Sequence, residues 1–210
     1  CQTMHPGSSC LVIPTEAARR ALDNLGWRTA GKLIQHVLLL DPRDKLNEKM
    51  GDDTLSGPLG AVYSSLLKSM LWLRKNRGYS LERTEGFDES FDRFWRDFPK
   101  KGFRLADRSL TSLNWRYTAH PNQRFQVSRL IFDSRLVGYI IFEINGRTCS
   151  VYDLLARSPK HLAQMLAMFV QQIMEESLAS IRITLNDAHP YRRALLWMGF
   201  IGRQDHTVFQ

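Results

Sequence analysis

The sequence predicts an α+β fold in which helices flank a mixed, mostly antiparallel sheet. Three runs rich in β-branched and aromatic residues follow one another with short turns between them, which is typical of an antiparallel meander. The turn Asn145-Gly146 is the strongest hairpin signal in the chain. A long helical stretch then leads to another strand, which can therefore lie parallel to the strand before the helix. The strands expected here span 124–132, 135–145, 147–155, 180–185 and 200–209, and the long helix spans 158–176.

Apolar residues at helical spacing predict the other helices. The clearest case is segment 87–98, whose aromatic residues recur on one face, and core packing is the first interpretation of that face. Ser158-Pro159 has the residue types expected at a helix cap and first turn, so the long helix should begin there. The remaining helices are expected at 14–25, 59–75, 110–117 and 190–198, and further strands at 31–40 and 80–83.

One phrase occurs twice in the chain. Residues 15–27 and 188–200 both contain Arg-Arg-Ala-Leu, then three residues, then Gly and a large aromatic residue, at a constant offset of 173 positions (192 − 19 and 199 − 26). A repeated helix that ends in Gly-aromatic suggests two copies of one domain type. Because only fourteen residues precede the first copy, we expect the chain to begin inside a domain. The expected division is a tail of a first domain at 1–40, a linker with a helix at 41–79, and a second domain at 80–210.

Composition and charge limit the classes of ligand and partner that are expected. The chain has a net charge of +8, which suits either an unremarkable basic protein or an anionic ligand such as a nucleotide cofactor. The basic residues are spread along the chain without a nucleic-acid-binding pattern, so no nucleic-acid partner is expected. Three sparse cysteines, at 1, 10 and 149, favour a reducing compartment and a cytoplasmic location. No metal site and no membrane span are expected.

The order of elements resembles that of the GNAT acyltransferase superfamily. The resemblance covers Arg83 to Gln210 as one nearly complete domain and Leu11 to Leu40 as the tail of another. It rests on the Arg-Arg-Ala-Leu-x-x-x-Gly-Phe phrase that ends at Phe200, and on Arg108 with the stretch SLNWRYTAHP at 112–121, which look like a bacterial two-domain subgroup of that superfamily.

The resemblance implies a cleft for acetyl-CoA or another acyl-CoA where the fourth and fifth strands part. Backbone groups at the end of the fourth strand would pair with the pantetheine arm, and the start of the next helix would hold the pyrophosphate. The loop ARSPKHLA departs from the pattern of the family because it contains no glycine. The expected cofactor-binding residues are Leu154, Leu155, Ala156, Arg157, Ser158, Lys160, His161 and Asn186, the last of which would equally suit a turn.

The catalytic residues expected from the resemblance are Asp153 and Tyr191. Asp153 is preferred over Glu143 as the general base because it lies near the cofactor end of its strand; the alternative is a carboxylate that bonds local backbone. In the family, a tyrosine that acts as general acid for the departing thiolate lies four residues before the glycine of Gly-Phe. This chain has Leu195 at that position. Tyr191 lies one turn earlier and would take that role, or it would be a surface tyrosine. Trp115 and Tyr117 would line an acceptor pocket or pack in the core.

Two functions remain open at this stage. The first is an acyl-CoA-dependent N-acyltransferase, most simply one that moves an acetyl group to the amine of a small molecule or peptide. The second is a non-catalytic module of the same fold that supports the first domain copy or a partner protein. In both cases the second domain is expected to pack against the first copy within one polypeptide.

Overall fold

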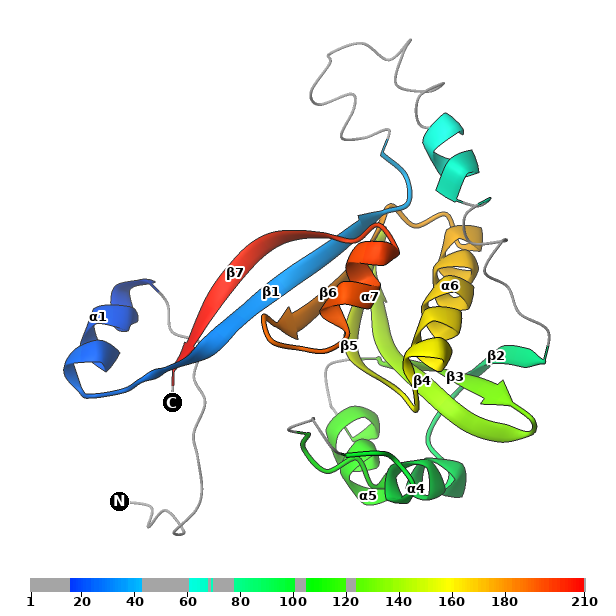
Figure 1. Cartoon of the computed structure of the whole chain (residues 1–210), viewed down its shortest axis with the longest axis horizontal. Helices are drawn as coiled ribbons and strands as arrows, with labels where there is room; N and C mark the ends of the chain where they lie inside the picture. The colour runs from blue at the N-terminus through cyan, green and yellow to red at the C-terminus, as the bar shows by residue number, and fades with distance from the viewer. Residues whose placement is uncertain are drawn as a thin grey trace.

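The computed structural model describes residues 16–42, 61–67, 69, 78–100, 105–119 and 124–209. Their strands form one seven-stranded sheet in the order β2-β3-β4-β5-β6-β1-β7 (Figure 1). Every neighbouring pair is antiparallel except β5 and β6, which are parallel. The fold is therefore α+β with a mixed, mostly antiparallel sheet, as the sequence predicts. No helix among the described residues is long and apolar enough to cross a membrane.

The elements follow the sequence pattern closely. The strands are β1 (Thr29–Leu39), β2 (Tyr79–Thr84), β3 (Gln126–Phe132), β4 (Arg135–Asn145), β5 (Thr148–Ala156), β6 (Ser180–Asn186) and β7 (Ile201–Phe209). The helices are α1 (Glu16–Asn24), α4 (Glu89–Arg96), α5 (Leu110–Leu113), which continues as a π-helical turn η1 (Asn114–Thr118), α6 (Pro159–Glu175) and α7 (Arg192–Trp197). Residues 61–67 and 69 are also helical, whereas most of the expected linker and the rest of that helix lie outside the described residues.

The two hairpins of the meander use backbone conformations that suit their residues. Asp133 and Ser134 both have positive φ, 49° and 59°, as a two-residue turn between right-twisted strands requires. Gly146 has φ 56° in the second hairpin, where glycine meets no steric penalty. The strand β6 then returns parallel to β5 after α6, so the crossover expected from the sequence is confirmed.

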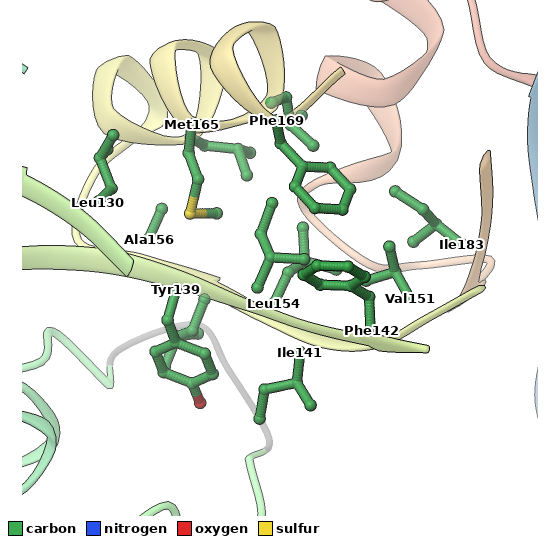
Figure 2. Close-up of a cluster of buried hydrophobic side chains, with 14 of the residues drawn as sticks. Leu130, Tyr139, Ile141, Phe142, Val151, Leu154, Ala156, Met165, Phe169 and Ile183 are labelled. Atoms are coloured by element: carbon green, nitrogen blue, oxygen red, sulfur yellow. The ribbon is translucent and has the colours of Figure 1, made fainter. Parts of the chain in front are cut away.

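The sheet is covered on both faces. On one face Phe169 of α6 stacks edge-on against Phe142 of β4, with ring centroids 5.0 Å apart, and Figure 2 shows Met165 and Phe169 reaching toward Leu154 and its neighbours. Tyr139 points to the opposite face, because successive side chains on a strand alternate. There it meets the α4 residues Phe91 and Phe94, at 5.5 and 5.8 Å between ring centroids. The aromatic face of α4 is thus core packing.

The long helix α6 lies very close to the sheet and begins at a defined point. Ser158 caps it by accepting a hydrogen bond from the backbone N–H of His161, and Pro159 occupies the first turn. A Cβ added at Gly138 would lie 2.9 Å from the sulfur of Met165 and 3.0 Å from the carbonyl oxygen of Leu155. A side chain at position 138 would therefore require Met165 to move and the β5 backbone at Leu155 to shift slightly.

The strand β1 occupies a place that the sequence does not predict. It lies inside the sheet, hydrogen-bonded to β6 on one side and to β7 on the other, and forms a long ribbon with β7 (Figure 1). Val37 and Leu38 are buried, with 7% and 1% of their surface exposed. Residues 29–39, expected as the tail of a separate domain, are thus an integral part of the sheet formed by residues 78–209.

Candidate functional site

The parallel strands β5 and β6 part toward one end of the sheet. They pair only from Thr148 to Val151 on β5, against Ser180 to Ile183 on β6. Beyond that point β5 stays paired with β4, and a register shift between Ile141 and Phe142 of β4 adds one residue to β5 at Tyr152. The last residues of β5, from Asp153 to Ala156, therefore have no ladder with β6. Backbone groups on that side of β5 need other partners.

Tyr191 supplies partners at the end of β5. Its hydroxyl accepts a hydrogen bond from the backbone N–H of Ala156 and donates one to the carbonyl oxygen of the same residue, each at 3.0 Å. The side chain is buried, with 5% of its surface exposed, and burial raises the pKa of the phenol. The alternative of a surface tyrosine is therefore wrong. The phenol reaches the end of β5 from the start of α7, where it is fixed to the backbone of Ala156.

The start of α6 is basic, but its backbone donors are partly used. The N–H of Arg157 bonds to the carbonyl of Val137 at 2.9 Å, Pro159 has no N–H, and the N–H of His161 bonds to Ser158. Burial, and then the charges of Lys160 and Arg157, lower the pKa of His161. The local potential is therefore positive, which suits an anion, while three of the backbone positions that would hold a phosphate through N–H groups are unavailable.

Asp153 is held by a partly buried arginine, Arg108. Both of its carboxylate oxygens accept hydrogen bonds from the guanidinium of Arg108, from Nε and from one terminal nitrogen, each at 3.0 Å. The hydroxyl of Tyr139 donates to the same carboxylate at 3.4 Å. The side chains of Arg108 and Asp153 are only 13% and 7% exposed. A carboxylate bound on both oxygens in this way positions Arg108 and is poorly placed to take a proton from an amine.

His189 is a neighbour that the sequence interpretation overlooked. Its Nδ1 accepts a hydrogen bond from the backbone N–H of Tyr191 at 3.1 Å, and the two rings lie 4.9 Å apart. Burial and the positive charge of Arg108 lower the pKa of His189, with Asp153 opposing them. These residues thus form one polar cluster beside the end of β5. The only signals in the sequence are that His189 precedes Tyr191 by two positions and that Arg108 lies in the region of family resemblance.

The other residues expected at the site are placed as follows. Leu154 and Leu155 are core side chains, 6% and 1% exposed, so any contact they make with a ligand is through their backbone. Asn186 accepts a hydrogen bond from the N–H of Ala188 at 2.9 Å, which is a turn interaction. Lys160 is exposed on the first turn of α6.

The residues weighed for the base and for an acceptor pocket differ in exposure. Glu143 accepts a hydrogen bond from the hydroxyl of Tyr152, whose side chain is 48% exposed. Trp115 is 74% exposed, whereas Tyr117 is buried and close enough to Asp153 and Arg108 to be influenced by their charges. Only Tyr117 of this group therefore adjoins the polar cluster.

The fold is that of GCN5-related N-acetyltransferases. A protein from Enterococcus faecalis described as a probable N-acyltransferase superposes with a TM-score of 0.59 at 10% identity, over 90% of this chain and 42% of its own. A GCN5-related N-acetyltransferase from Anabaena variabilis gives 0.58 at 12% identity, over 95% and 44%. A tandem GNAT protein from the clavulanic acid biosynthesis pathway gives 0.52 at 14% identity, over 93% and 59%.

These similarities are structural. No protein-family model matches the sequence, and the comparison with curated proteins gives no match. The chain spans between 42% and 59% of the length of the three solved chains. At 10–14% identity the likeness defines the fold of this chain, while its substrates are a matter for proposal.

Proposed function

We propose that this chain is the acyl-donor-binding part of an acyl-CoA-dependent N-acyltransferase, which moves an acetyl group from acetyl-CoA to the amine of a small molecule or peptide. The observation that carries the proposal is the parting of β5 from β6 within a sheet of the GNAT type. Such a gap leaves strand backbone unpaired, and an extended ligand with amide groups can pair with it as a further strand would.

The backbone of β5 is arranged for such a ligand. The N–H and C=O of Ala156 point into the gap, because they bond the hydroxyl of Tyr191. Leu154 lies two residues earlier on the same strand, so its backbone groups face the same side. The pantetheine arm of acyl-CoA carries two amides and would replace the phenol at Ala156. Binding therefore requires Tyr191 to leave the position in which the structure holds it.

The other end of the donor has a basic place to lie. Lys160 and Arg157 stand at the start of the 17-residue helix α6, where the helix dipole adds positive potential. We assign the diphosphate of acyl-CoA to this end, with contacts from the two side chains replacing most of the backbone donors of a glycine-rich loop. In this proposal Arg108 and His189 border the acceptor side of the gap, and Asp153 positions Arg108.

A second candidate function is favoured by one observation. The phenol of Tyr191 satisfies both backbone groups of Ala156, so these two groups at the end of β5 already have partners within the chain. Together with the glycine-free loop, this internal pairing suits a non-catalytic module that keeps the fold and supports another domain or a partner protein. The two candidates differ in one measurable property, which is affinity for acyl-CoA.

Thermal unfolding with and without excess acetyl-CoA tests the proposal. A ligand present at 100 times its dissociation constant adds about 2.7 kcal/mol to the stability of the protein that binds it. We expect a clear rise of the midpoint in the wild type and a smaller rise in Lys160→Ala. Arg182→Ala is the matched control, because Arg182 is exposed on β6 where that strand is still paired with β5, and it should behave as the wild type. An unchanged midpoint in the wild type would favour the module.

Location and acceptor stay proposals. The one described cysteine, Cys149, is a free buried thiol, which is compatible with the cytoplasmic location predicted from the sparse cysteines. The acceptor is proposed to be an amine because the solved proteins of this fold include a GCN5-related N-acetyltransferase.

A further inference from the structure

His189 lies in the turn that leads from β6 into α7, and the backbone of this turn holds it in place (Figure 1). Its N–H donates a hydrogen bond to the carbonyl oxygen of Asn186 at 2.9 Å, and its own carbonyl oxygen accepts one from the N–H of Arg192 at 3.1 Å. The ring Nδ1 accepts a hydrogen bond from the backbone N–H of Tyr191 at 3.1 Å. The imidazole is therefore an acceptor at the start of α7.

The hydrogen bond from Tyr191 requires a neutral imidazole. A ring nitrogen that accepts a hydrogen bond carries no proton, so the single proton of the neutral ring of His189 is on Nε2. The imidazolium form donates from both nitrogens and has no acceptor left. Protonation of His189 therefore removes the partner of the Tyr191 N–H.

Tyr191 is held at two points, and His189 provides one of them. The backbone N–H bonds to His189, while the hydroxyl bonds the N–H and C=O of Ala156, each at 3.0 Å. The rings of His189 and Tyr191 also pack edge to face, with centroids 4.9 Å apart. These contacts link the imidazole, through one residue, to the backbone at the end of β5.

The charged groups beside His189 disfavour the imidazolium in this arrangement. Burial and the positive charge of Arg108 lower the pKa of His189, and the negative charge of Asp153 opposes them. Both oxygens of Asp153 already accept hydrogen bonds from Arg108. The phenol of Tyr191, which packs against the ring, is uncharged because burial raises its pKa. The arrangement thus favours neutral His189, whereas a ring released into solvent would titrate at its ordinary pKa of 6.5.

We propose that His189 is a positioning residue that keeps the phenol of Tyr191 on Ala156, and that protonation of His189 releases the phenol and frees the end of β5 for a ligand. The identity of this ligand as acyl-CoA rests on the proposed function, whereas the release of the phenol does not. Since the released form binds the proton more readily, acid favours release below about pH 6.5. One titrating group shifts such an equilibrium by at most about tenfold per pH unit.

Hydrogen exchange resolved to single backbone amides tests the release directly. The amide of Ala156 bonds to Tyr191, whereas the next amide, that of Arg157, bonds to the carbonyl oxygen of Val137 at 2.9 Å. Protection is the intrinsic exchange rate at each pH divided by the observed rate. A general loss of stability lowers the protection of both amides, so their ratio reports the local release. We expect the ratio of Ala156 to Arg157 to fall by about tenfold between about pH 7.5 and about pH 5.5.

Two variants at position 189 separate the charge from the hydrogen bond. His189→Asn keeps an oxygen that can accept the N–H two residues later, as asparagine does in turns, and it does not titrate. The protection ratio in His189→Asn should therefore stay at the value of the wild type at about pH 7.5, whatever the pH. His189→Ala removes the acceptor, so its ratio should be low, by about tenfold, at both pH values. Urea denaturation shows whether each variant is folded, and wild type against His189→Asn decides the question if His189→Ala is not.

The inference is wrong if the ratio in the wild type does not change with pH, if His189→Asn responds to pH as the wild type does, or if folded His189→Ala keeps a high ratio. Calorimetry with acetyl-CoA at the same two pH values tests the ligand separately. Tighter binding in acid is expected for the wild type and not for His189→Asn. If exchange shows the release but acetyl-CoA binds at neither pH, the proposed function fails while the role of His189 stands.

Discussion

The hydroxyl of Tyr191 bonds both backbone groups of Ala156 at 3.0 Å and so takes the place of a neighbouring strand where β5 and β6 part. A buried hydroxyl that satisfies one N–H and one C=O leaves both groups unpaired when it is removed. This one contact therefore bears on the stability of the domain and on its affinity for a ligand.

Tyr191→Phe should lower the free energy of unfolding by about 1–3 kcal/mol, because two buried backbone groups lose their partner while the ring still fills its space. Urea denaturation measures the change. The control is Tyr152→Phe, whose hydroxyl bonds Glu143 from a side chain that is 48% exposed, and there we expect less than about 0.5 kcal/mol. Equal losses of unfolding free energy in the two variants would show that the contact with Ala156 stabilises the fold no more than an exposed hydrogen bond does.

Asp153→Asn should destabilise the domain by about 3–5 kcal/mol, because Arg108 would keep its charge in a buried place without a counter-ion. Replacing both residues, with Arg108→Met and Asp153→Leu, should cost less than Asp153→Asn alone, since no charge is then left behind. Chemical denaturation of the single and double variants gives both values.

Arg147→Gln is the matched control for the buried pair. The ion pair of Arg147 with Asp41 is more exposed, at 50% and 15%, so its loss should cost at most about 1 kcal/mol. If Asp153→Asn lowers the free energy of unfolding no more than Arg147→Gln does, water must reach the ion pair of Arg108 and Asp153.

Cys149 should be inert in the folded protein. Burial raises the pKa of its thiol to about 12, from an ordinary 9.0, so the thiolate is scarce. In a Cys1→Ser, Cys10→Ser background, a thiol reagent at about pH 8 should react only after denaturant is added. Since the unfolded chain releases this proton first, stability should also fall as the pH rises above 9.0. Rapid labelling without denaturant would contradict the burial of this strand.

Acid should destabilise the domain through its histidines. Burial is the first cause of the lowered pKa of each of three histidines, His36, His161 and His189. Positive charges nearby lower these pKa values further: Arg192 acts on His36, Lys160 and Arg157 act on His161, and Arg108 acts on His189. Below pH 6.5 the unfolded chain binds protons that the folded chain does not, so stability is lost as the pH falls through that value. Denaturation at about pH 7.5 and about pH 5 should show the loss, and His189→Asn should reduce it. A stability that rises toward pH 5 would contradict this sign.

The local elements could be predicted from sequence because their signals are local. The hairpin at Asn145-Gly146, the cap at Ser158 and the aromatic face of 87–98 each depend on residues a few positions apart, and each is confirmed. The position of β1 depends on which strand it joins across more than a hundred residues, and periodicity carries no information about that choice.

The candidate site was harder to predict for the same reason. Arg108 and Asp153 meet from two elements 45 residues apart, and only the family resemblance had drawn attention to both. Spacing placed Tyr191 one turn before the expected tyrosine, but it could not show that the ring is buried and that its hydroxyl bonds Ala156. For Asn186 the sequence pattern was a sufficient guide to the turn alternative, because a turn hydrogen bond is the ordinary role of asparagine at the end of a strand.

Titration of acetyl-CoA into the wild type and into Tyr191→Phe, followed by calorimetry, is the most direct test of the proposed function. If acyl-CoA pairs with Ala156 in place of the phenol, the wild type should bind it and Tyr191→Phe should bind it about tenfold more tightly, because a competing pair of hydrogen bonds worth roughly 1.4 kcal/mol has been removed. Absence of binding in both folded proteins would contradict the acyltransferase proposal and leave the domain as a supporting module.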